Sequence, residues 1–127
     1  MRQVTSRDPF MYGFEQKKDQ LSEPLRVFLL RCVEAVRRDY PDAKIILYGS
    51  QARGQATPES DVDMLILLDS EIPSQERSAI HDRLYEIGLE HDMVISALID
   101  SVPEWEQPIS RATPLYQAVQ EEGILVP

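Results

Sequence analysis

The segment from Asp61 to Leu68, DVDMLILL, places the tightest limit on how this chain can fold. Beyond its two acids every residue is apolar, so the strand that it predicts must bury the side chains on both of its faces. A strand of this kind lies in the interior of a sheet that is covered on each side. The chain therefore needs other elements to cover both faces of a sheet.

Helices and strands alternate around this segment. Apolar residues at three- and four-residue spacings predict a helix from Leu21 to Asp39, which Pro41 ends, and AKIILY at 43–48 predicts a strand. The sequence further predicts a short helix at 50–55, a long helix at 72–91, a strand at Asp92–Ile99, a loop around Pro103 and Pro108, and a final helix at 113–123. This order indicates a compact α/β or α+β domain with a small sheet.

Length and composition predict one cytoplasmic domain. With 127 residues the chain has room for one hydrophobic core, and we assign 1–20 to a polar N-terminal segment and 21–127 to the domain. We expect no membrane association, because no apolar run is long enough to span a bilayer and no signal peptide is visible. The single cysteine, Cys32, fits a reducing compartment and a buried structural thiol.

The charge of the chain bears on its partners. The formal net charge is -9, which argues against the broad basic face that binds nucleic-acid backbones. We therefore expect no direct nucleic-acid partner. An acidic surface suits a basic protein partner, although negative charge also keeps proteins soluble.

Two acids at the start of the predicted buried strand are candidates for metal binding. Side chains two residues apart in a strand share a face, so Asp61 and Asp63 point the same way, with α-carbons roughly 6 to 7 Å apart. Their mutual repulsion would raise at least one pKa, and a bound Mg²⁺ would relieve it. A solvated turn is the alternative interpretation of the pair.

A glycine-serine pair upstream is a candidate for phosphate binding. Gly49 follows the strand at 43–48, and Ser50 begins the short helix, so backbone N-H groups and a hydroxyl can approach a phosphate. Arg53, one turn later, offers a planar donor fork to another phosphate or forms a surface ion pair.

Together these residues resemble the signature of the minimal nucleotidyltransferases (MNT), a branch of the DNA polymerase beta superfamily. Gly49 and Ser50, ten further residues and then Asp61, Val62 and Asp63 match its spacing. The local sequences GSxARG and SDVD and the closing segment PLYQAVQEEGILV are also similar to those of the family. The resemblance spans roughly 21–126. It implies an α+β fold in which helices flank a small mixed central sheet, and transfer of a nucleoside monophosphate from a triphosphate with release of pyrophosphate.

The resemblance also implies a third carboxylate. Asp92, at the head of the strand DMVISALI, is the natural match, with Glu90 and Asp100 as alternatives. The implied reaction uses ATP and two Mg²⁺ ions. Its catalytic and metal-binding residues are Asp61, Asp63 and Asp92, and its nucleotide-binding residues are Gly49, Ser50 and Arg53.

Family members of this size imply a protein acceptor. They pair with HEPN-domain ribonuclease toxins and in described cases attach AMP to a toxin tyrosine, so we expect a nucleotidyltransferase that acts as an antitoxin. One alternative is modification of a small hydroxylated molecule such as an aminoglycoside. Another is a non-catalytic antitoxin module that binds its partner by contact alone, with Trp105 and Tyr116 either as surface anchors or in the core.

Overall fold

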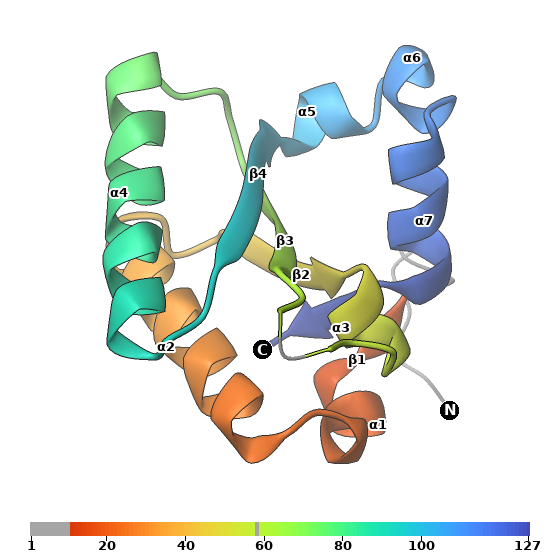
Figure 1. The fold of residues 1–127 in the computed structure, drawn as a ribbon. Coiled ribbons are helices and arrows are strands. Elements are labelled where there is room, and N and C mark those ends of the chain that lie inside the picture. Colours follow the sequence, from red (N-terminus) through yellow and green to blue (C-terminus); the bar gives the residue numbers. More distant parts are fainter. Residues whose placement is uncertain (1–10, 58) are drawn as a thin grey trace.

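The computed structural model describes residues 11–57 and 59–127, which form a five-stranded sheet with helices on both faces (Figure 1). The strands lie in the order β1-β5-β2-β3-β4. They are β1 (Tyr12–Gly13), β2 (Lys44–Tyr48), β3 (Val62–Leu68), β4 (Ile95–Ser101) and β5 (Ile124–Val126). The helices are α1 (Phe14–Lys17), α2 (Glu23–Asp39), α3 (Ser50–Arg53), α4 (Ser74–Glu90), α5 (Val102–Trp105), α6 (Pro108–Arg111) and α7 (Pro114–Glu122), with a 3-10 turn, η1, at Lys18–Gln20.

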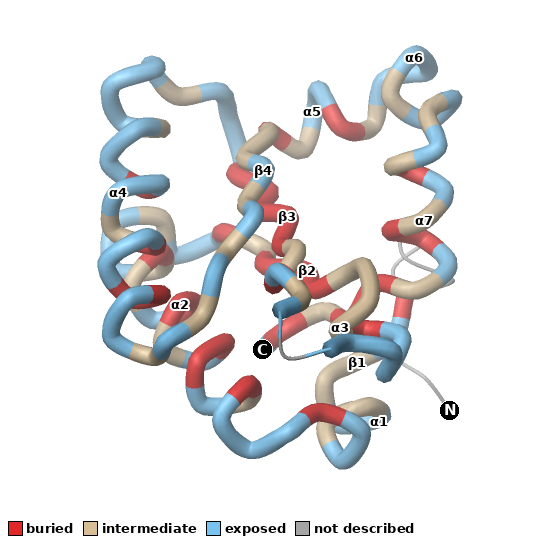
Figure 2. The backbone as a smooth tube through the Cα atoms, viewed as in Figure 1, coloured by how far each residue is buried: buried red, intermediate tan, exposed pale blue. Residues whose placement is uncertain are grey.

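The sheet is mixed. β2 runs antiparallel to both β3 and β5, whereas β3 is parallel to β4 and β1 is parallel to β5. The predicted architecture, a small mixed sheet flanked by helices, is confirmed. β3 lies between β2 and β4 and is buried along most of its length, as its two apolar faces predict (Figure 2).

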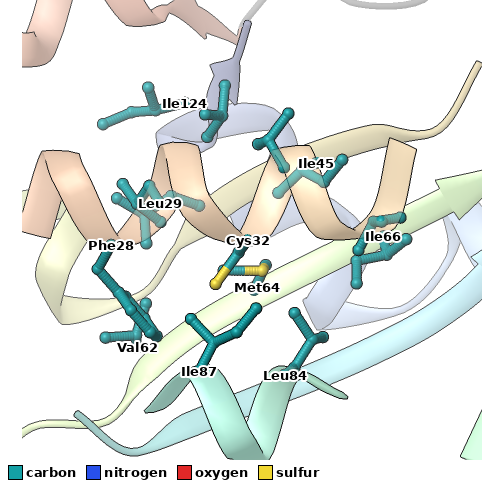
Figure 3. Packing of buried hydrophobic residues seen from close by; sticks show 14 of the residues in the cluster. Phe28, Leu29, Cys32, Ile45, Val62, Met64, Ile66, Leu84, Ile87 and Ile124 are labelled. Carbon is teal, nitrogen blue, oxygen red and sulfur yellow. The ribbon is translucent and has the colours of Figure 1, made fainter. Parts of the chain in front are cut away.

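One face of the sheet packs against α2 and α4. Figure 3 shows side chains of these two helices meeting side chains of β2, β3 and β5. The labelled members of this cluster are Phe28, Leu29, Cys32, Ile45, Val62, Met64, Ile66, Leu84, Ile87 and Ile124. Cys32 is fully buried as predicted, and burial raises the pKa of its thiol to about 12.

The opposite face packs against α5 and α7. Trp105 of α5 and Tyr116 of α7 lie in this second cluster with their ring centroids 5.0 Å apart, and Leu65 of β3 belongs to the same cluster. Because both rings are buried, they belong to the core rather than to an exposed surface. α5 and α6 lie where the sequence analysis predicts only a loop. That prediction was wrong because prolines in the first turn, Pro103 and Pro108, begin these two helices.

The predicted strand at Asp92–Ile99 is displaced along the chain. β4 begins at Ile95 because the preceding residues complete the end of α4. The Met93 N-H donates to the Gly88 carbonyl at 2.8 Å, and Asp92 adopts a left-handed conformation with φ 54°. Asp92 therefore belongs to a helix-ending turn and not to the head of a strand.

Part of the predicted N-terminal segment belongs to the sheet. β1 pairs with β5, and Met11 is buried in the second cluster, so the fold includes residues before position 21. Residues 1–10 of that segment lie outside the described residues. Among the helices that the structure describes, none combines the length and apolar character needed to cross a bilayer.

The first prediction concerns the contact between α4 and the sheet. Leu84 is fully buried, so replacing it with alanine should lower the free energy of unfolding by about 3 kcal/mol. Leu89 of the same helix is 65% exposed, and Leu89→Ala should cost less than about 1 kcal/mol. Urea denaturation followed by circular dichroism measures both. Equal losses in the two variants would contradict the packing of α4.

Candidate active site

The turn after β2 brings backbone and carboxylate together. Tyr48, the last residue of β2, pairs with Asp63 of β3, so Gly49 follows next to Asp63. Gly49 has φ 79° and ψ -159°, a conformation almost restricted to glycine. A Cβ atom at Gly49 would also collide with the Asp63 carboxylate. Glycine is therefore required twice, for its backbone conformation and for the close approach of Asp63.

The short helix α3 starts directly from this turn. Ser50 is its first residue, and the Arg53 N-H donates to the Gly49 carbonyl at 3.1 Å. Gly54, with φ 72°, ends the helix. No hydrogen bond between described residues uses the Ser50 hydroxyl, so it is available to a ligand at the start of α3.

The two predicted acids lie together at the start of β3. Val62 and Met64 point into the α2 and α4 layer, so Asp63 between them points to the opposite face. Burial, followed by the charge of Asp61, raises the pKa of Asp63, and the charge of Arg53 acts against this shift. Asp61 is exposed just before the strand. The pair therefore concentrates negative charge beside the Gly49 turn.

Arg53 is held by a residue that the sequence analysis did not select. Its Nη1 lies 3.0 Å from Oε2 of Glu122, the last residue of α7. The same Oε2 accepts a hydrogen bond from the Gly49 N-H at 2.6 Å. Of the two interpretations of Arg53, the ion pair is therefore formed in this structure. The glutamate directly before Gly123 in the closing segment is the feature of the sequence that points to Glu122.

Asp92 is not grouped with Asp61 and Asp63 among the residues that the structure describes. It lines a cavity of about 670 Å³ that extends from Leu25 of α2 to Gln51 and Gly54 of α3. It is also absent from the charges that shift the pKa of Asp63. The structure therefore does not bring Asp92 together with Asp61 and Asp63, because the turn that ends α4 holds it elsewhere.

The position beside Asp63 on β4 is occupied by Ser96. The two residues are partners in the parallel pairing of β3 and β4 and lie on the same face. Glu90 instead ends α4, 3.8 Å from Arg31, and Asp100 pairs with Leu67 toward the far end of the strands. In the described part of the chain, no three His, Cys, Asp or Glu side chains are grouped to hold a metal ion.

The two aspartates nevertheless fit one Mg²⁺ ion that is bound together with a nucleotide. Mg²⁺ prefers oxygen ligands and usually uses one or two carboxylates, substrate phosphates and water. Asp61 and Asp63 supply carboxylates whose repulsion a cation would reduce. Gly49 leaves the space in which the Asp63 carboxylate lies. The arrangement can therefore bind a metal-phosphate complex.

Substitution of the two glycines around α3 tests this geometry. Gly49→Ala should destabilise the protein by about 3 kcal/mol or more, because it adds a collision with Asp63 to an unfavourable backbone conformation. Gly54 is the matched control, since it also has a positive φ but faces open space. Gly54→Ala should cost only about 1 kcal/mol. Equal losses in chemical denaturation would show that Asp63 does not lie against Gly49.

Removing the charge of Asp63 should stabilise the metal-free protein at pH 7. Its raised pKa means that the folded state holds the proton more tightly than the unfolded state does, so ionised Asp63 destabilises the fold. The advantage of Asp63→Asn in thermal unfolding with a chelator should shrink as the pH falls toward the ordinary value of 3.8. Asp82→Asn, at an exposed position of α4, removes the same charge elsewhere. An equal gain in that control would assign the effect to net charge alone.

Comparison with known proteins identifies the family of the chain. The family model described as "Nucleotidyltransferase domain" matches residues 29–125, which include β2, α3, β3 and α7. The chain is 35% identical over 80 residues to "Putative protein adenylyltransferase MJ0604" of Methanocaldococcus jannaschii, covering 63% of this chain and 73% of that protein. It is 36% identical over 67 residues to "Putative protein adenylyltransferase MJ0141" of the same organism, covering 53% and 67%. The chain belongs to the nucleotidyltransferase domain family and is a nucleotidyltransferase.

Proposed function

We propose that this protein transfers AMP from Mg²⁺-bound ATP to a hydroxyl group of a protein, and that the acceptor is a tyrosine of a HEPN-domain toxin. In this role it would act in the cytoplasm as the antitoxin of the pair. The observation that carries the proposal is the contact between the Gly49 turn and the Asp63 carboxylate, with Asp61 alongside. It combines a phosphate-binding backbone with metal-binding oxygens in one site.

Each side chain of the site has a part in nucleotide binding. The N-H groups at the start of α3 and the Ser50 hydroxyl would donate to the outgoing phosphates, and Arg53 would add a charged donor. Asp61 and Asp63 would hold the metal ion. When bound, Mg²⁺ neutralises phosphate charge and lowers the pKa of a coordinated hydroxyl.

The reaction needs positioning more than a protein nucleophile. The acceptor oxygen attacks the α-phosphorus in line with the bond to the β-phosphate oxygen; that bond breaks, pyrophosphate leaves and the hydroxyl proton passes to solvent. Two carboxylates suffice to hold one ion. The second Mg²⁺ expected from the family resemblance would need a further carboxylate, and Ser96 occupies the position beside Asp63.

A protein acceptor is supported by the relatives and by the charge of the chain. Both relatives carry the name of protein adenylyltransferases, and a net charge of -9 suits a basic partner. The HEPN toxin is the specific partner implied by the family resemblance.

A transfer assay tests the proposal. The purified protein is mixed with ATP, Mg²⁺ and the product of the neighbouring gene, and the partner is examined by mass spectrometry for added AMP. Asp61→Asn and Asp63→Asn should each reduce transfer at least about 100-fold, because each removes a metal ligand. Asp92→Asn should leave transfer nearly unchanged, since Asp92 is not grouped with Asp61 and Asp63 in the described part of the chain. A loss in Asp92→Asn equal to that in the other two variants would restore Asp92 as the third carboxylate.

A non-catalytic antitoxin module is the second candidate function. Ser96 beside Asp63 favours it, because the site then lacks the third acid that the family resemblance implies. Neutralisation of the toxin by Asp61→Asn and Asp63→Asn, with no AMP on the partner, would support this function over transfer. Loss of both transfer and neutralisation in these variants would support the catalytic antitoxin.

A further inference from the structure

The end of α7 is attached to the phosphate side of the site by Glu122. We propose that Glu122 is a positioning residue, which fixes the Gly49 turn and orients the Arg53 guanidinium for the phosphates of the nucleotide. The inference rests on the proposed function, because it assigns the nucleotide as the ligand of Arg53. It adds to the site a residue on a third element, far along the chain from the glycine-serine pair and the two aspartates.

The Glu122 carboxylate makes three polar contacts at once. Oε2 accepts from the Gly49 N-H at 2.6 Å, and Nη1 of Arg53 lies 3.0 Å from Oε2 and 3.2 Å from Oε1. The Glu122 side chain is 20% exposed, compared with 45% for Arg53. A charged hydrogen bond to a backbone N-H in a partly buried place is stronger than an exposed ion pair alone. These contacts restrain both the turn and the guanidinium.

Arg53 is restrained from a second side as well. Its Nε donates to Oε1 of Gln55 at 3.1 Å. None of its hydrogen bonds to the described residues uses Nη2. The guanidinium is therefore held at Nε and Nη1, and Nη2 remains available as a donor. A planar group held in this way loses less conformational entropy when it binds a phosphate.

Glu122 is itself firmly placed between α7 and β5. The next residue, Gly123, donates its N-H to the Val119 carbonyl at 2.8 Å and accepts from the Tyr12 N-H at 2.9 Å. A Cβ atom at Gly123 would collide with that Val119 carbonyl and lie 3.0 Å from Ile46. The chain at the end of α7 thus has little freedom. A rigid support of this kind is what a positioning residue requires.

Charge alone predicts the opposite role for Glu122. A third negative group near Asp63 would repel a triphosphate, and removing it would strengthen nucleotide binding. The positioning role predicts weaker binding, because the Arg53 guanidinium would lose its restraint. Glu122→Gln separates the two effects, since its amide oxygen can still accept from the Gly49 N-H while the ion pair with Arg53 is lost.

The test is a double-mutant cycle on binding of a Mg²⁺-bound, non-hydrolysable ATP analogue, measured by isothermal titration calorimetry. Glu122→Gln should weaken binding about tenfold in the otherwise unchanged protein. In the Arg53→Ala background it should weaken binding less than about twofold, because Glu122 then has no guanidinium to orient. Glu121→Ala is the matched control, an exposed glutamate at the neighbouring position, and should bind like wild type. Circular dichroism confirms that each variant is folded.

A second variant keeps the test decisive if Glu122→Gln does not fold. Arg53→Lys preserves the charge but not the planar fork, so orientation predicts about tenfold weaker binding whereas charge alone predicts no change. Equal or tighter binding by Glu122→Gln, or the same loss in the Arg53→Ala background, would overturn the positioning role and leave the proposed function intact. Failure of the wild-type protein to bind the Mg²⁺-nucleotide complex would overturn the proposed function and the inference with it.

Discussion

The antiparallel pairing of β2 with β3 is the constraint on which the site depends. It places Tyr48 opposite Asp63, and Gly49 therefore turns next to the carboxylate of Asp63. The intervening residues have to leave the end of β2 and return to the start of β3, and α3 with the loop after it does this. A shift of one residue in this register would send Asp63 into the core between the sheet and α2, so the apolar pattern of β3 and the geometry of the site determine each other.

The site holds several carboxylates close together, and their mutual repulsion is unfavourable in the absence of a cation. Burial and the charges of Asp61 and Glu122 raise the pKa of Asp63, and the charge of Arg53, which is paired with Glu122, lowers it. A cluster of this kind costs stability in the metal-free protein and favours a cationic ligand. The fold offsets this cost because β3 is buried on both faces beyond the two aspartates. Helices on each side of the sheet pack against this strand.

The sequence analysis was accurate where the pattern is strong and local. The apolar run after Asp63 predicts a strand buried on both faces. The spacing between the glycine-serine pair and the aspartates predicts that these residues lie together, and the pairing of β2 with β3 brings Gly49 next to Asp63. Asp92 could not be placed, because it ends a helix through a left-handed backbone conformation, which aspartate can adopt but which the local sequence does not predict. The strands β1 and β5, of two and three residues, are too short for periodicity to reveal them. Glu122 joins the site through tertiary contact from α7, and the glutamate-glycine pair that marks it in the sequence does not reveal which residues it contacts.

The most direct test of the central claim is a crystal structure of the protein with Mg²⁺ and a non-hydrolysable ATP analogue. We predict that the triphosphate lies beside the Ser50 hydroxyl and Arg53, with the metal ion between its phosphates and the carboxylates of Asp61 and Asp63. A triphosphate bound away from these groups, with the metal ion held by Asp92 instead of Asp61 and Asp63, would contradict this arrangement.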